Sequence, residues 1–282
     1  MNQHTMSRIS RFLIIASAII TVFIIVLIIG YILFSGIGPI IDEIQKLFSG
    51  LPSIFNLEYT SENVSLIPAL INTIILTFMS ILIAGFFGIC TAIYLVEYSN
   101  SESSLVKLIR ITTETLAGIP SIIYGLFGSI FFVVFLQLGM SLLAGIFTIS
   151  IMILPLIIRS TEEALKAVPM EFREASFGLG AGKLRTIFVI VLPSAMNGIL
   201  AGIILAIGRV VGETACLIYT AGTSPNVGNL FTTGRTLSVH MYMLTSEGLY
   251  INQAYATSAI LLFIVVGMNI ISSRIAKRML KV

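Results

Sequence analysis

The chain has 282 residues, of which 57% are apolar and only 10% are charged, and its formal net charge is +3. This composition lies far outside that of a soluble domain and indicates an integral membrane protein. The small net charge gives no indication of nucleic-acid binding. Cys90 and Cys216 both fall inside apolar segments without metal-ligand spacing, so we expect neither a disulfide nor a metal site.

Six apolar segments are long enough to cross a bilayer as helices, which takes about 20 residues each. The first is too long for the hydrophobic region of a signal peptide, which has roughly 7–15 residues. We therefore predict an all-α, polytopic membrane protein with six transmembrane helices. The predicted spans are residues 12–34, 69–95, 116–137, 142–158, 195–219 and 255–273.

The basic residues predict the orientation, because cytoplasmic loops are enriched in Lys and Arg. The side expected to be outside holds only Lys46 and Arg235. Both termini are therefore expected in the cytoplasm. The basic residues on the predicted cytoplasmic side are Arg8, Arg11, Lys107, Arg110, Arg159, Lys166, Arg173, Lys183, Arg185, Arg274, Lys277, Arg278 and Lys281.

Three further features of the sequence leave alternatives open. Apolar residues over 39–48 follow helical spacing, which predicts a short helix on the outer surface or an ordinary loop helix. Asn72, Thr73 and Thr77 could line a polar path, although hydrogen bonds between helices are the commoner use. The loop 221–254 is rich in Gly, Thr and Asn, and is either a docking surface for a binding protein or a solvated loop.

The connection 159–186 is unusually structured for a cytoplasmic loop. Pro169 interrupts a helical run, and a second short amphipathic helix is expected over Glu171–Phe177. The following GLGAGK is not a phosphate-binding P-loop, because Leu184 stands where that loop needs Ser or Thr. Nucleotide binding must therefore come from a partner chain. A sharp backbone turn is permitted by Gly178, Gly180 and Gly182.

Residues 174–193 resemble the cytoplasmic signature of ABC importer permease subunits, EAA-x3-G-x9-I-x-L-P. Ser176 replaces the second alanine, and the rest of the spacing is kept through Pro193. The resemblance implies a type I importer permease fold in which this segment is a coupling helix seated on a separate ATPase. A passive cytoplasmic hairpin is the alternative. The implied ATPase-coupling residues are Glu174, Ala175, Ser176 and Gly180.

Two further motifs resemble phosphate-specific permeases. AGIPSIIYGLFG at 117–128 is similar to their GIPS-[IV]-x-YGLFG run, and GRVVGETA at 208–215 to their GR-x2-GETA run. The continuation CLIYTAG is similar to the A-type (PstA) subunits. The resemblance covers a permease core over 69–282 with the coupling loop 159–186, and it leaves 1–68 as a separate helix and outer loop.

The resemblance also implies a cellular location, partner subunits and a source of energy. The chain would be a multi-pass protein of a bacterial or archaeal plasma membrane that forms the phosphate path. Its partners would be a homologous PstC-like permease subunit, two PstB-like ATP-binding subunits, a PstS-like phosphate-binding protein and membrane lipid. The chain itself would bind no cofactor, and ATP would be used by the partner ATPase subunits.

Two charged residues, Arg209 and Glu213, lie inside the fifth predicted span. Each costs about 2.5–3.5 kcal/mol at a bilayer centre, so we expect them to serve a polar path. The planar Arg fork matches two phosphate oxygens, and Glu213 could neutralise and aim Arg209 while the path is empty. A structural ion pair is the alternative. Arg159 could receive phosphate at the cytoplasmic side, or simply extend to lipid headgroups.

Other classes of protein fit the sequence less well. A permease for sulfate or molybdate shares the charge argument, and only the two phosphate-permease motifs count against it. An intramembrane enzyme lacks HExxH and GxSxG motifs and has no histidine within a span. An anion channel does not need an ATPase-docking loop. We predict no catalytic and no metal-binding residue, and we assign no role to His240.

Overall fold

The computed structural model describes residues 3–99 and 103–279, and this part of the chain contains helices and no strand. The elements are α1 Gln3–Phe48, α2 Ile67–Ile93, η1 Tyr94–Tyr98, α3 Ser104–Ala117, α4 Ser121–Gly128, η2 Ser129–Phe135, α5 Leu142–Lys166, α6 Met170–Gly178, α7 Lys183–Thr186, η3 Ile187–Val191, α8 Leu192–Val211, α9 Ala215–Thr220, α10 Leu237–Glu247 and α11 Ile251–Met279. The three η segments are π-helical turns that continue the α-helices beside them.

The predicted all-α fold is confirmed for the described residues. Five helical stretches are long and apolar enough to cross a membrane, and a bent pair gives a sixth. The bent pair is α3 with α4–η2, whose axes differ by 105°. The five continuous stretches are Arg11–Phe48, Ile67–Tyr98, Leu142–Lys166, Lys183–Val211 and Ile251–Met268.

The third predicted span, residues 116–137, is not one straight helix. Pro120 begins α4 and cannot continue the helix that ends at Ala117. A proline lacks the backbone N–H and disfavours helical geometry at the residue before it. The apolar part of this span therefore lies in α4 and η2, at a steep angle to α3.

The fifth predicted span, residues 195–219, is also broken. Helix α8 ends at Val211, and α9 begins only at Ala215. Between them the Glu213 carboxylate accepts a hydrogen bond from the Cys216 backbone N–H at 3.1 Å, at the first turn of α9. A side chain that binds a free backbone N–H at a helix start favours a new helix over continuation of the old one.

The short outer helix expected over 39–48 is the last part of α1 and not a separate element. Its residue Glu43 is buried and accepts hydrogen bonds from Lys46 Nζ at 2.7 Å and from the Ile54 backbone N–H at 3.1 Å. These contacts attach the end of α1 to the outer loop that follows it.

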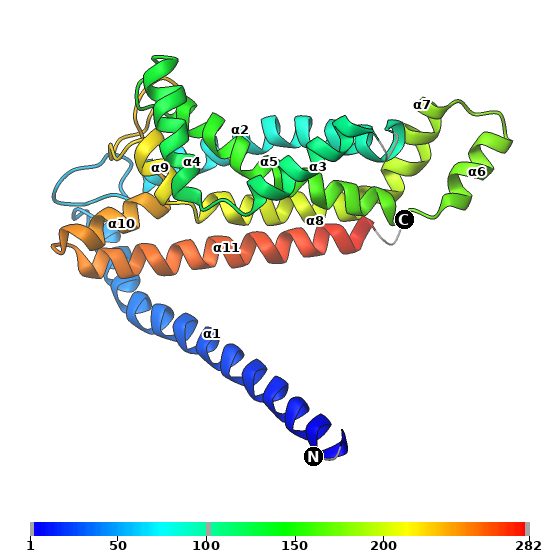
Figure 1. Cartoon of the computed structure of the whole chain (residues 1–282). Helices are drawn as coiled ribbons and strands as arrows, with labels where there is room; N and C mark the ends of the chain where they lie inside the picture. The colour runs from blue at the N-terminus through cyan, green and yellow to red at the C-terminus, as the bar shows by residue number, and fades with distance from the viewer. Residues whose placement is uncertain (1–2, 100–102, 280–282) are drawn as a thin grey trace.

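Helix α1 packs against α11 near its outer end and diverges from the bundle toward the N-terminus (Figure 1). At the crossing, the hydroxyls of Tyr31 and Tyr255 lie 2.9 Å apart. A Cβ at Gly36 would lie 2.6 Å from that of Ala259, so only glycine allows this approach. Toward the N-terminus, apolar side chains such as Phe12 and Phe23 are exposed. This surface must be covered by lipid or by another protein.

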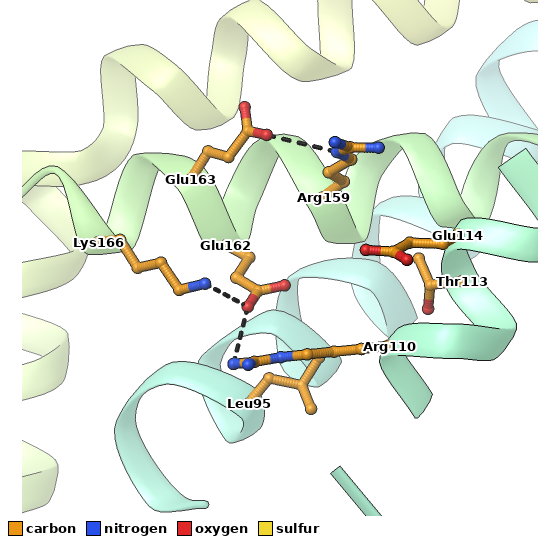
Figure 2. A pocket seen from close by; sticks show the side chains of 8 residues that line it. All are labelled: Leu95, Arg110, Thr113, Glu114, Arg159, Glu162, Glu163 and Lys166. Carbon is orange, nitrogen blue, oxygen red and sulfur yellow. Dashed lines mark hydrogen bonds and ion pairs between the residues drawn. The ribbon is translucent and has the colours of Figure 1, made fainter. Parts of the chain in front are cut away.

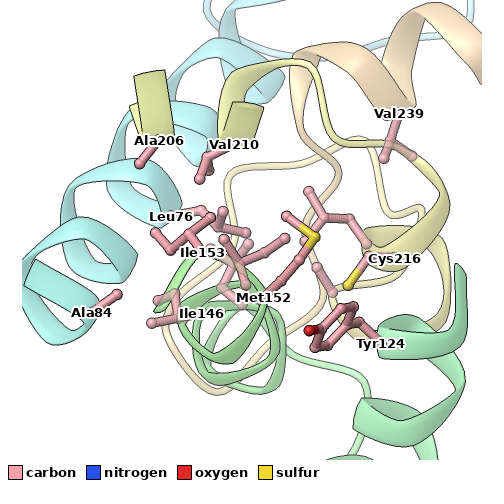
Figure 3. Close-up of a cluster of buried hydrophobic side chains, with 14 of the residues drawn as sticks. Leu76, Ala84, Tyr124, Ile146, Met152, Ile153, Ala206, Val210, Cys216 and Val239 are labelled. Carbon is pink, nitrogen blue, oxygen red and sulfur yellow. The ribbon is translucent and has the colours of Figure 1, made fainter. Parts of the chain in front are cut away.

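The main core surrounds α5, which is packed by α2, α4, α8 and α9 (Figure 3). Leu76, Ile149 and Ile153 are fully buried there. The C-terminal part of α11 and the pair α6 and α7 lie at the same end of the molecule, whereas the first turns of α1 lie apart from the bundle (Figure 1). Lys281, one of the residues used for orientation, lies outside the described residues.

Candidate translocation path and coupling hairpin

Arg209 lies in the last turn of α8 and its side chain is exposed. It lines a pocket of about 390 Å³ whose other walls are apolar, formed by α5, α8 and α11. Within the described part of the chain, Arg209 forms no ion pair. The structure therefore presents an uncompensated guanidinium on the surface of the bundle. The other lining residues are Leu156, Leu205, Gly208 and Val265.

Glu213 does not occupy the position expected from a continuous helix. The break after Val211 removes it from α8, and its buried side chain turns to the start of α9. Its backbone carbonyl accepts a hydrogen bond from Ser238 Oγ at 2.6 Å. The expectation of one helix with Arg209 and Glu213 a turn apart is therefore wrong, because the Glu213 carboxylate is committed to a backbone N–H.

The two segments that resemble phosphate permeases, 117–128 and 208–215, meet in the structure. Helix α4 carries the first segment and packs against α9, which follows the second. A Cβ at Gly125 would lie 2.8 Å from the Cα of Cys216, so the two backbones are in direct contact. Tyr124 points into the same cluster (Figure 3), and its hydroxyl donates to the Leu116 carbonyl at 2.7 Å.

Arg159 lies in the C-terminal part of α5 and lines a pocket of about 250 Å³ (Figure 2). Its Nε contacts Glu163 Oε1 at 3.4 Å, and both side chains are more than half exposed. The neighbouring Glu162 binds Arg110 at 3.0 Å and Lys166 at 2.7 Å. The structure thus places Arg159 among other charges and in a different pocket from Arg209.

The coupling hairpin, which we define as residues 167–186, contains α6 and α7. Gly180 has φ +81°, a left-handed conformation that favours glycine. Glu174, Ala175 and Gly180 are exposed, as a docking role requires. Ser176 is buried instead, with its hydroxyl 2.8 Å from that of Thr186. Its hydroxyl therefore closes the hairpin and does not face a partner.

Large apolar side chains on the hairpin form a surface that the sequence analysis did not identify. Leu179 is 90% exposed, and three side chains of α6 are about half exposed or more. Exposed apolar clusters outside the membrane spans mark protein–protein contacts. Two features of the sequence could have indicated this apolar surface: the glycine turn, and the apolar residues that alternate with charged ones along α6. The α6 residues are Met170, Phe172 and Phe177.

Arg173 is the buried member of the same helix. Its Nη2 lies 2.7 Å from Glu97 Oε1 in η1, and both side chains are less than 10% exposed. Its Nη1 donates to the Val168 carbonyl at 2.8 Å and its Nη2 to the Leu165 carbonyl at 3.0 Å. This pair could not be predicted from local sequence, since 76 residues separate its members.

The polar residues of α2 organise the outer loop. Asn72 Nδ2 donates to the carbonyls of Asn226 and Arg235 at 3.0 and 3.1 Å, and Asn72 Oδ1 accepts from the Gly228 N–H. Thr73 Oγ1 accepts from the Leu237 N–H at 2.8 Å. Thr73 thus forms the expected hydrogen bond between helices, whereas Asn72 binds the loop before α10. Within the described residues, Thr77 Oγ1 is buried without a hydrogen-bond partner.

These features define a class of protein. A bundle of membrane-length helices with a charged side chain beside an apolar pocket, and with an apolar hairpin exposed at one end, is typical of a membrane transport subunit. In the part of the chain that the structure describes, no group of His, Cys, Asp or Glu is arranged to hold a metal ion.

A family model described as "Binding-protein-dependent transport system inner membrane component" matches residues 84–281. The chain belongs to this family. It is a permease component of a binding-protein-dependent transport system and a multi-pass membrane protein.

Several curated relatives are similar over more than half of the chain. A Mycoplasma pneumoniae protein named "Phosphate transport system permease protein PstA homolog" is 40% identical over 181 residues, which are 62% of this chain and 28% of that protein. The Bacillus subtilis "Probable ABC transporter permease protein YqgI" is 32% identical over 64% of this chain and 66% of its own length. The Mycobacterium leprae protein named "Phosphate transport system permease protein PstA" is 32% identical over 72% and 67%, respectively. The chain thus spans less than two thirds of the first two relatives.

Solved structures show the same fold at low sequence identity. A bacterial alginate ABC transporter chain matches with a TM-score of 0.66 at 18% identity, over 96% of this chain and 98% of that one. A chain of the inward-facing MetNI methionine ABC transporter matches with a TM-score of 0.62 at 21% identity, over 76% and 95%. These likenesses support the predicted importer-permease architecture.

Proposed function

We propose that the chain is the A-type permease subunit of an ATP-driven phosphate importer and forms part of the path by which phosphate crosses the membrane. The relatives named PstA and the two matching motifs support phosphate as the substrate. The observation that carries the proposal is the unpaired guanidinium of Arg209 beside an otherwise apolar pocket.

Arg209 is suited to lower the barrier for an anion. Moving an anion into a low-dielectric path removes its hydration, and a fixed guanidinium replaces part of it with two parallel N–H donors. Glu213 is held by α9, so its role is to fix the break next to Arg209 rather than to neutralise it. The arginine therefore remains available to the passing ion.

Arg159 would receive phosphate near the cytoplasmic end. Its contact with Glu163 is long, at 3.4 Å, and exposed. Such surface pairs contribute about 0–1 kcal/mol, so an incoming anion can displace the carboxylate at little cost. Arg159 and Arg209 would thus act in sequence from separate pockets.

The surfaces of the chain indicate where the proposed partners bind. The exposed apolar face of α1 and the pocket at Arg209 face outward from the bundle, where a PstC-like subunit would complete the path. The coupling hairpin would dock on one of two PstB-like ATPases, and the outer loops would receive a PstS-like phosphate-binding protein. In this arrangement the hairpin and both termini lie in the cytoplasm, beneath a bacterial or archaeal plasma membrane.

The substrate assignment is tested with the complete transporter in liposomes, by measuring ATP-dependent uptake of radioactive phosphate. We expect Arg209→Gln to lower uptake by about 10- to 100-fold, since a hydrogen bond to a charged group contributes about 1.5–3 kcal/mol. Lys107→Gln removes an exposed charge far from the pocket and serves as control. Normal uptake by correctly inserted Arg209→Gln would contradict the proposal. Stronger stimulation of the ATPase by sulfate or molybdate than by phosphate would replace phosphate with that oxyanion.

Docking of the hairpin is tested by disulfide crosslinking to the ATPase. The background carries Cys90→Ser, because Cys90 is exposed. Leu179→Cys, at the most exposed position of the hairpin, is expected to crosslink. Ser176→Cys is the matched inward-facing control and should react weakly. Absence of any crosslink from Leu179→Cys would remove the support for docking at this face.

A further inference from the structure

Arg235, one of two basic residues expected on the outer side, is buried in the connection between α9 and α10, with only 4% of its surface exposed. Its backbone is fixed at both ends, because its N–H donates to the Ser224 carbonyl at 2.9 Å and its carbonyl accepts from Asn72. The guanidinium carbon lies 4.8 Å from the centroid of the Tyr59 ring. Its Nε and Nη2 are buried without a hydrogen-bond partner, and no carboxylate in the described ranges forms an ion pair with it.

His240 contacts the same tyrosine. It is fully buried in the first turns of α10, and its ring meets that of Tyr59 edge to face, with centroids 6.4 Å apart. The backbone of Val64 is beside the ring, but neither ring nitrogen meets hydrogen-bond geometry. Four nitrogens of Arg235 and His240 are thus buried and unsatisfied around one aromatic side chain.

This arrangement is costly unless an anion completes it. A buried charge without a partner destabilises a protein, and the cation–π contact with Tyr59 compensates only part of that cost. A tetrahedral oxyanion offers the oxygens that the guanidinium fork needs. A neutral imidazole has one donor and one acceptor nitrogen, so it also matches an oxyanion that keeps a proton.

The protonation state of His240 agrees with this geometry. Burial, and next the charge of Arg235, lower the pKa of the His240 imidazole to about 3. The ring is therefore neutral near pH 7 and retains its acceptor nitrogen. Monohydrogen phosphate has a P–OH group that can donate to it, whereas sulfate has none.

We propose that Arg235 and His240 hold a phosphate ion on the outer side of the chain, as a staging site before the ion reaches Arg209. The proposal rests on the proposed function for the identity of the ion. Helix α10 connects the two places directly. Ser238, two residues before His240, donates to the carbonyl of Glu213 in the break after α8. Occupancy of the staging site is therefore linked to the segment that follows Arg209.

The test measures the thermal stability of the purified transporter complex without ATP or binding protein. Phosphate, sulfate and chloride are titrated at constant ionic strength, in an Arg209→Gln, Arg159→Gln background that removes both proposed phosphate contacts of the path. We expect phosphate to raise the Tm in a saturable manner. Arg235→Met keeps the length of the side chain without its charge and should lose this rise, with an equal or higher Tm in the absence of phosphate. Lys46→Gln, which removes the other outer basic residue, should keep the rise.

Identical phosphate responses of the parent and Arg235→Met would overturn the staging site. His240→Leu should reduce the preference for phosphate over sulfate toward equality, and an unchanged preference would overturn the role of the imidazole. The uptake assay separates this failure from failure of the proposed function. If phosphate uptake is normal and Arg235→Met leaves the phosphate-induced rise in Tm unchanged, the staging site alone is overturned. If only sulfate raises the Tm and phosphate uptake is absent, both the staging site and the proposed function are overturned.

Discussion

Arg173 of α6 and Glu97 of η1 form a buried ion pair, with 2.7 Å between Nη2 and Oε1. The same guanidinium donates to two carbonyls at the end of α5, those of Leu165 and Val168. One side chain of the coupling hairpin is therefore attached to the ends of two candidate membrane spans. A displacement of α6 must move both spans or break these bonds, which gives a physical link between the hairpin and the bundle.

Breaking this pair should destabilise the hairpin. Removing one partner leaves an uncompensated buried charge, which costs about 3–5 kcal/mol. We expect Arg173→Met and Glu97→Met each to lower the Tm and the phosphate transported per ATP. The double variant should recover part of the stability, because neither charge remains. A double variant as unstable as the sum of the two single variants would show that the pair is not coupled.

The turn of the hairpin should tolerate only glycine at one position. Gly180→Ala is expected to cost about 1–2 kcal/mol, because φ +81° brings a Cβ close to the following carbonyl. Gly178→Ala is the control: it lies in α6, has open space around it and should gain up to about 1 kcal/mol in helix propensity. Thermal melting of the two variants gives the comparison. Equal changes in Tm for the two variants would mean that the left-handed conformation of Gly180 does not require glycine.

The contact between α4 and α9 should be sensitive to one methyl group. Gly125→Ala places a Cβ 2.8 Å from the backbone of Cys216, so the helices must separate, at a cost of about 1–3 kcal/mol. Gly85→Ala, in α2 with nothing within 4 Å, should be neutral or stabilising. We expect Gly125→Ala to reduce phosphate uptake and Gly85→Ala to leave it unchanged. Unimpaired uptake by Gly125→Ala would argue against a role for this contact.

The stability of the chain should depend on pH through His240. Its folded-state pKa, lowered to about 3, lies below the ordinary value, so the unfolded chain takes up a proton first as the pH falls. The free energy of unfolding should therefore decrease below about pH 6.5, by about 2 kcal/mol between pH 7 and pH 5 from this residue. His240→Leu should show a smaller decrease in Tm over that interval. The same pH dependence of the Tm in the parent protein and in His240→Leu would show that His240 is not its source.

Several site predictions followed directly from local sequence. The coupling helix was expected over Glu171–Phe177 and occurs over Met170–Gly178, because a proline, an amphipathic run and a glycine turn all act within one segment. The exposure of Glu174 and Ala175 fits the same expectation. The inward position of Ser176 did not follow, since it depends on Thr186 in α7, ten residues further along the chain. The roles of Arg209, Glu213 and Arg159 in transport stay predictions.

Hydropathy located the membrane segments but not their breaks. The span expected over 195–219 is apolar throughout, and only the hydrogen bonds of Glu213 to α9 and α10 show why α8 stops. Arg235 was assigned to an outer loop by the distribution of basic residues. Its burial could not be predicted, because Asn72 and Tyr59, far away in the chain, enclose it.

By itself, the sequence determined that this protein is an all-helical membrane permease and located its hairpin at 167–186. Hydrophobic length and turn chemistry act over neighbouring residues, so they can be read along the chain. Tertiary structure alone decided which charges are compensated: Arg173 has a carboxylate, Arg209 faces an open pocket, and Arg235 is buried with no carboxylate paired to it among the described residues. The energy of a charge depends on burial and on neighbours brought together by folding, which the order of residues does not specify.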